Sequence, residues 1–284
     1  MAMITDILLD TLLDVARLVP FLFLTYLLME WMEHTTDGAF ESFLEKHRKS
    51  APIFASLFGL VPECGFSSAA GNLYTTGVIS AGTMIAVFLS TSDEMVPILV
   101  SSQVQPMVIF RILAVKFVTA CIAGLLADRF SIHRRADIES FCERENCECD
   151  DGIFKSALKH TLRIVFWLFV LTFFINGFME LFGEEALRSF VIAHEKSGVM
   201  IILCTLIGLI PSCASSVLLS KLYLEGIISF AAVNAGLLAN AGLGLMVLFR
   251  VNPDWKNNLK IVLYIVAVSI ITGFLLNILF PGLV

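Results

Sequence analysis

The sequence has little charge for its length and few signals of a soluble protein. Only 15% of the 284 residues are charged and 57% are apolar, whereas soluble domains average about 25% charged and about 45–50% apolar. The apolar excess has to face lipid, which excludes a soluble enzyme, a secreted disulfide scaffold and a disordered chain. The N-terminus lacks the basic region of a cleaved signal peptide, so we expect the first span to stay in the mature protein.

Other features that the sequence lacks exclude further classes of function. The net charge of −6 leaves no basic patch for nucleic acid. None of the five His residues lies in an apolar core segment, so an intramembrane enzyme would lack a histidine base beside its nucleophile. The seven Cys residues form neither a disulfide framework nor the paired spacing of a zinc knuckle. We expect no enzyme, no resident cofactor and no nucleic-acid partner.

Several of the apolar segments are interrupted. Long ones cover about 4–31, 106–126, 162–182 and 259–280, and another begins at Ala51 and is broken by Pro62-Glu63-Cys64-Gly65. Short pieces at about 77–90, 95–100, 227–239 and 243–249 are separated by polar or glycine-containing turns. A straight helix needs about 20 residues to cross a bilayer. The short pieces therefore predict broken or re-entrant helices.

The broken region occurs twice. GLVPECGFSSAAGNLYTTGVIS (59–80) aligns without a gap on GLIPSCASSVLLSKLYLEGIIS (208–229), 149 residues later. Proline, cysteine, tyrosine and two glycines match in register, which is unlikely for two unrelated apolar helices. We interpret the chain as a tandem duplication of 1–130 and 155–284, joined by the hydrophilic linker 131–154.

Charge predicts how the halves are oriented. Short cytoplasmic loops hold an excess of Lys and Arg. The region between the halves carries six such residues, whereas the first cation of the chain is Arg17 and the last is Lys260. A cytoplasmic linker with both termini outside requires an odd number of spans per half. We expect about ten helices in two inverted repeats; four spans per half remain an alternative.

The interruptions are the candidate site. Proline frees backbone carbonyls beside Cys64 and beside Cys213, and acids at membrane depth mark function. We predict that Cys64, Cys213, Asp93 and Glu94 bind a metal ion, because sulfur mixed with oxygen suits a borderline divalent ion or a trivalent metalloid. The full set predicted to line one central cavity is Cys64, Cys213, Asp93, Glu94, Asn240, Glu63, Ser212, Asn234 and Thr91.

Simpler explanations stay open for each motif. The cysteines could be small buried hydrophobes, and Thr91 with Glu94 could form a capping box. Lys116 or Arg111 could pair with Asp93 or Glu94 and turn a cation site into an anion site. The linker cysteines 142, 147 and 149, set among acids, predict either a metal-capture loop or a solvated linker.

The paired GLxPxC segments, each followed by LYxxGxIS, and the TSDE turn resemble the bacterial ten-helix heavy-metal exporters, labelled as arsenic-efflux or manganese transporters. The resemblance covers nearly the whole chain and implies efflux of a metal or metalloid.

We therefore expect an all-α, multi-pass protein of the plasma membrane with a cytoplasmic linker. It would act as a secondary transporter that exports a manganese-like divalent cation or an arsenical, with proton exchange at the carboxylates as a coupling route. The bilayer and the cargo are its expected partners, and a homodimer is left open. The alternatives are a transporter of a small organic solute, an intramembrane enzyme, or a channel or structural subunit.

Overall fold

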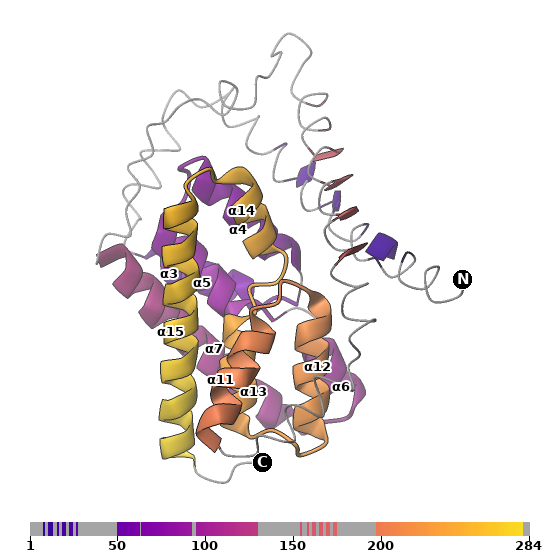
Figure 1. The fold of residues 1–284 in the computed structure, drawn as a ribbon, viewed down its shortest axis with the longest axis vertical. Helices are drawn as coiled ribbons and strands as arrows, with labels where there is room; N and C mark the ends of the chain where they lie inside the picture. The colour runs from indigo at the N-terminus through magenta and orange to yellow at the C-terminus, as the bar shows by residue number, and fades with distance from the viewer. Residues whose placement is uncertain are drawn as a thin grey trace.

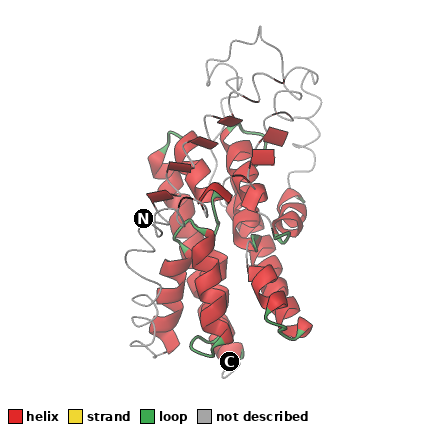
Figure 2. Cartoon of the chain, turned by 90° about the vertical axis from the view of Figure 1, so that its right-hand side faces the viewer, coloured by secondary structure: helices red, strands yellow, loops and turns green. Residues whose placement is uncertain are grey.

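Every element of secondary structure in the described residues is a helix. The computed structural model describes residues 50–62, 64–92, 95–129 and 197–280, with scattered residues in 8–27 and 154–174. Figure 2 shows short loops between consecutive described helices of the same half. The first-half helices are α3 (Ala51–Gly59), α4 (Cys64–Thr75), α5 (Ala81–Ser90), α6 (Met95–Ser101) and α7 (Pro106–Arg129). The second-half helices are α11 (Ser197–Gly208), α12 (Cys213–Leu224), α13 (Phe230–Ala239), α14 (Gly244–Val251) and α15 (Trp255–Leu279).

The helix boundaries repeat at the sequence offset. Helix α4 and helix α12 begin and end 149 residues apart, as do α5 and α13. Gly77 (φ 80°) and Gly226 (φ 71°) follow α4 and α12 in the left-handed conformation that glycine adopts without strain. The duplication seen in the sequence is thus also a repetition of helices.

Two of the four short pieces start later than the apolar pattern predicts, whereas α6 and α14 begin within one residue of the predicted 95 and 243. We expected the other two from about 77 and 227, but α5 begins at Ala81 and α13 at Phe230. The reason is capping: the Ser80 side chain accepts a hydrogen bond from the Thr83 N–H (3.1 Å), and Ser229 accepts one from Ala232 (3.3 Å). The apolar residues just before these caps belong to the turn. Asp254 likewise starts α15 at Trp255, ahead of the predicted 259.

Each half packs one of its short helices against the other half. Figure 1 shows α14 beside α4 in the upper part of the molecule and α6 beside α12 in the lower part. A Cβ added to Gly244 at the start of α14 would lie 2.7 Å from the Ser67 carbonyl oxygen of α4. Each cysteine-headed helix therefore packs on the helix that follows the break in the other half.

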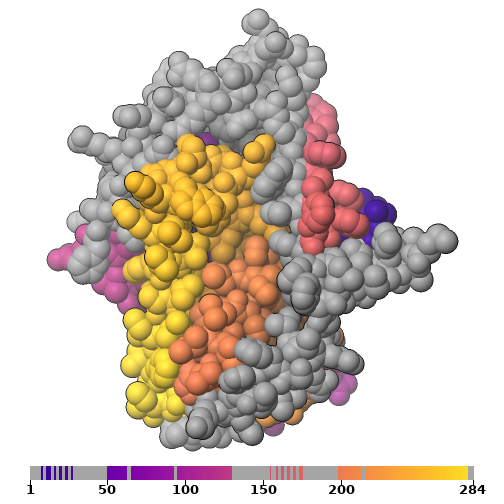
Figure 3. Space-filling model, viewed as in Figure 1, coloured from indigo at the N-terminus to yellow at the C-terminus, as the bar shows by residue number. Residues whose placement is uncertain are grey.

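Broken spans lie inside and unbroken spans outside. Four segments are long and apolar enough to cross a membrane, among the described residues: Ala81–Ser101, Pro106–Arg129, Phe230–Val251 and Trp255–Leu279. In the most apolar windows of the two broken spans 75% and 94% is buried, against 28% in each unbroken one. Figure 3 shows α15 along the outer surface, where Leu263, Ile271 and Ile278 are exposed. These apolar surfaces fit a polytopic membrane protein.

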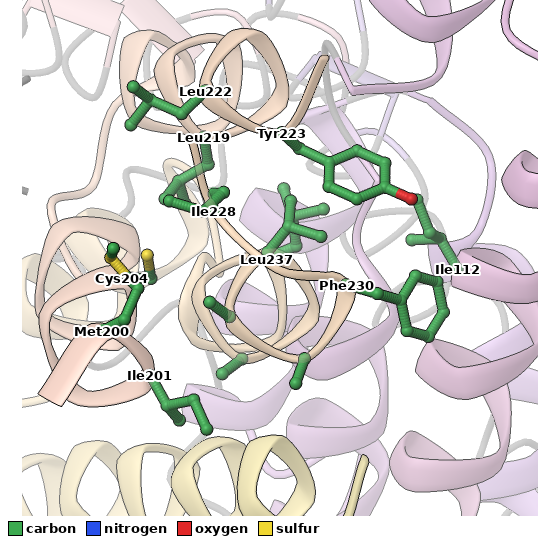
Figure 4. Packing of buried hydrophobic residues seen from close by; sticks show 14 of the residues in the cluster. Ile112, Met200, Ile201, Cys204, Leu219, Leu222, Tyr223, Ile228, Phe230 and Leu237 are labelled. Carbon is green, nitrogen blue, oxygen red and sulfur yellow. The ribbon is translucent and has the colours of Figure 1, made fainter. Parts of the chain in front are cut away.

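The core joins the halves. A cluster built mainly on α11, α12 and α13 also takes in Met95, Leu99 and Ile112 from the first half. Figure 4 shows Phe230 and Tyr223 pointing toward Ile112 of α7. The predicted boundaries of the linker at 131 and 154, and the span at 162–182, lie outside the described residues or among the scattered ones.

Candidate functional site: two helix breaks bridged by Lys116

Each broken span is interrupted in the protein interior. Helix α5 ends at the cap residue Thr91, and α6 begins at Met95; helix α13 ends at the cap residue Asn240, and α14 begins at Gly244. Thr91 is 3% exposed and Asn240 is 2% exposed. Non-helical backbone at membrane depth is tolerated only where protein or a water cavity surrounds it. The described residues of both interruptions are therefore surrounded by protein.

Lys116 of α7 connects the two interruptions. Its Nζ donates a hydrogen bond to the Thr91 carbonyl oxygen at the end of α5 and another, of 3.0 Å, to the Leu237 carbonyl oxygen in the last turn of α13. The side chain is only 1% exposed. One ammonium group thus holds the end of a first-half helix against the end of a second-half helix.

Both carbonyls are available because the helices stop there. In a continuous helix the Met95 N–H would bond Thr91, but it donates to the Ser92 carbonyl instead (3.1 Å). Likewise the Ala241 N–H donates to Ala239 (3.1 Å) and not to Leu237. The last carbonyls of a helix need other partners, and Lys116 is that partner here.

The second break is closed differently. The Asn240 side-chain oxygen accepts a hydrogen bond from the Gly242 N–H (3.0 Å), and Gly242 has a φ of 54°. This Asx turn interrupts the helix between α13 and α14. Asn240 was predicted to support a ligand site, and the structure places it as the cap of α13 with its carbonyl side chain bonded to its own turn.

Two buried asparagines carry unpartnered amide atoms. In the described part of the chain neither Nδ2 nor Oδ1 of Asn72 on α4 has a hydrogen-bond partner, and the same holds for Oδ1 of Asn234 on α13. Both side chains are fully buried. Asn234 donates its Nδ2 hydrogen to the Phe230 carbonyl (2.8 Å), which leaves its oxygen as an acceptor. Buried polar atoms are nearly always satisfied, so such exceptions point to a ligand or water site.

The fold and this interior polar site can be set beside known proteins. A family model described as "Putative, 10TM heavy-metal exporter" (ArsP_2) matches residues 1–197. The chain belongs to this family. The match takes in the first half, with Cys64, Thr91 and Lys116, and ends at the first residue of α11. Neither the curated proteins nor the solved structures contain a match to the chain.

Membership of the exporter family agrees with the resemblance noted from the sequence, and the metal ligands themselves remain a prediction. Asp93, Glu94 and Glu63 lie outside the described residues, as do the side chains of Cys64 and Cys213. Within the described residues no group of three or more His, Cys, Asp and Glu could hold a metal ion.

The remaining predicted residues fall into two places. Thr91 lies at the Lys116 bridge, and Asn234 is one turn before Leu237 on α13. Ser212 is buried at the start of α12, where its carbonyl accepts a hydrogen bond from Ser215 Oγ (2.8 Å). The structure thus brings the end of α5 and the end of α13 together at Lys116.

Two features of the site were missed from the sequence. Lys116 was considered only as a partner for Asp93 or Glu94, a contact that lies outside the described residues. Its bonds to two main-chain carbonyls depend on which helices are neighbours, which the sequence does not show. Asn72 was not singled out at all, although an amide within an apolar helix was a usable signal.

Proposed function

We propose that this protein is a secondary transporter that exports a transition-metal ion or a metalloid through the interior region where the two helix breaks meet. The observation that carries the proposal is the Lys116 bridge between the ends of α5 and α13 in a member of a heavy-metal exporter family. Paired interrupted helices in two halves of a chain are typical of substrate sites in secondary transporters.

The proposed architecture is ten spans in two inverted repeats, 1–130 and 155–284, with the linker 131–154 in the cytoplasm and the protein in the plasma membrane. The repeated helix boundaries support two equivalent halves. The basic residues concentrated between the halves support an internal linker.

The proposed ligands are the two cysteines after proline, Cys64 and Cys213, and the acids Asp93 and Glu94. Helix α12, which begins at Cys213, packs against α6, which begins directly after those acids. This neighbourhood supports a site that joins Cys213 to the two acids, and the repeat adds Cys64 at the matching position. Such a donor set suits a manganese-like divalent ion or an arsenical better than magnesium or calcium. Asn240, Glu63, Ser212, Asn234 and Thr91 would line the surrounding cavity.

The carboxylates could also exchange protons when the cargo binds, so that inward proton movement drives export. Lys116 lies beside Thr91, two residues before Asp93, and its positive charge would offset part of the acidic charge. A neutral metalloid hydroxide would fit such a balanced site without further charge compensation.

A transporter of a small organic solute and an intramembrane enzyme are the competing functions. A metal-sensitivity screen separates them from the exporter. Cells lacking the protein should become sensitive to at least one ion among manganese, zinc, arsenite and antimonite. Expression of the wild type should restore growth, whereas the Asp93→Asn, Glu94→Gln double variant should not.

The single variants Cys64→Ser and Cys213→Ser should change which ion is tolerated more than they change overall resistance. Growth that is unaffected by every metal and metalloid would count against the exporter. A Cys64 to Cys213 separation above about 15 Å, measured between spin labels, would exclude a shared ion, because two sulfurs on one metal lie within about 5 Å of each other.

A further inference from the structure

Helix α7 does not need a charged side chain at the position of Lys116 in order to pack. Its counterpart at the repeat offset of 149 is Ile265 on α15. Both side chains are at most 1% exposed. The second half therefore builds the equivalent helix with an apolar residue at this position. Charges inside a membrane are costly and mark function, so the lysine serves something other than packing.

The ammonium group of Lys116 lies at the C-terminal ends of two helices. The C-terminal end of a helix carries roughly half a negative elementary charge. Helices α5 and α13 both end at Lys116, and each presents a carbonyl oxygen that the break has released from its helical hydrogen bond. Together the two ends therefore place about one negative charge against the ammonium group.

We propose that the carbonyl oxygens of Thr91 and Leu237 form a binding site for a monovalent cation, and that Lys116 fills this site from within the chain. Carbonyls of unwound segments and the C-terminal ends of half-helices are the groups that hold coupling cations in transporters with interrupted helices. In this protein the Lys116 ammonium would take the place of a free coupling cation.

The site has a mechanical consequence, which rests on the proposed exporter function. Because one ammonium binds both halves, any motion that separates the end of α5 from the end of α13 must first release it. The cation site itself is independent of the cargo and can be tested without knowing it.

The test is chemical rescue of a truncated side chain. Lys116→Ala removes the ammonium and leaves a cavity beside two unpaired carbonyls, so its thermal unfolding temperature in detergent should fall by about 10 °C. Methylammonium chloride should restore at least half of the loss, because it brings a free ammonium of the right size. Choline chloride at equal ionic strength should not, since its nitrogen has no hydrogen to donate.

Two variants control for the cavity. Ile265→Ala opens a cavity at the equivalent place on α15, where no such bridge exists, and methylammonium should leave it unchanged. Lys116→Met keeps the bulk of the side chain without the charge, so it should lose stability and not be rescued. Equal gains for all variants, or no gain for Lys116→Ala, would overturn the cation site.

If Lys116→Ala does not fold, Lys116→Gln replaces it. Glutamine can still donate to a carbonyl, so this variant should unfold at a higher temperature than Lys116→Met. Equal unfolding temperatures for the two would overturn the site. Failure of the exporter function would instead appear as absence of manganese or arsenite transport in the wild type, with the rescue result unaffected.

Discussion

At the scale of single residues, a substitution of Asn72 should affect stability and transport in opposite directions. An unsatisfied buried polar group destabilises a protein by about 1–3 kcal/mol, and both amide atoms of Asn72 are unsatisfied among the described residues. We expect Asn72→Leu to raise the thermal unfolding temperature, because it removes the unsatisfied atoms. It should also lower transport, since we propose that the amide lines a polar path for the cargo.

A matched control for Asn72 is Asn258, which is buried and fully engaged. Its Nδ2 donates to the Asn252 carbonyl (3.1 Å), and its Oδ1 accepts from Asn252 Nδ2 (2.6 Å). Asn258→Leu should therefore lower the unfolding temperature. If Asn72→Leu destabilises the protein as much as Asn258→Leu does, then Asn72 is a structural residue and the polar-path interpretation is wrong.

At the scale of elements, two glycines of α11 differ in how closely the neighbouring helix approaches them. A Cβ on Gly208 would lie 2.0 Å from the Gly236 carbonyl oxygen of α13, a backbone atom that cannot move aside. A Cβ on Gly198 would meet only the Phe274 ring, at 3.5 Å. We expect Gly208→Ala to abolish folding or reduce the yield of folded protein severely, as measured by size-exclusion chromatography in detergent.

The Gly198→Ala variant is the control on the same helix. It should fold normally and gain up to about 1 kcal/mol, since alanine favours a helix more than glycine does. Similar yields of the two variants would show that the α11 and α13 backbones are not in the close contact described here.

The helices and the breaks could largely be predicted from the sequence, because they follow from local signals. Pro62 and Pro211 stop one helix, and the next begins at Cys64 and at Cys213 as the interrupted pattern indicates. The starts of α5 and α13 were misplaced because apolar turn residues were counted as helix. The exchange of α6 and α14 between the halves could not be predicted, because it depends on tertiary neighbours.

The candidate site was predicted in part for the same reason. Thr91 and Asn240 stand at the helix ends, as the turns in the sequence indicate. The Lys116 bridge needs α7 to lie beside both α5 and α13, and no pattern within α7 reveals that.

At the scale of the whole molecule, the sidedness of the linker decides between inverted and parallel halves. Cys142, Cys147 and Cys149 in the linker provide native labelling sites. A membrane-impermeant maleimide should label them in inside-out vesicles and not in intact cells. A cysteine introduced near the C-terminus, Leu283→Cys, should show the opposite pattern, whereas labelling of both from one side would contradict an odd number of spans per half.

Serine replacement of the three linker cysteines is the control for this labelling. It should remove the signal from inside-out vesicles without changing the amount of protein in the membrane. Residual labelling in that variant would come from other cysteines, and the linker signal is then the difference between the two.

Counterflow in proteoliposomes tests the central claim most directly, that this protein moves a metal or metalloid through the region of the paired breaks. Vesicles loaded with unlabelled manganese or arsenite should accumulate the same labelled species from outside, for at least one of the two. The Asp93→Asn, Glu94→Gln double variant should accumulate none, whereas Asp254→Asn at the exposed cap of α15 should behave as the wild type. Absence of counterflow for both species, or full counterflow in the double variant, would contradict the account.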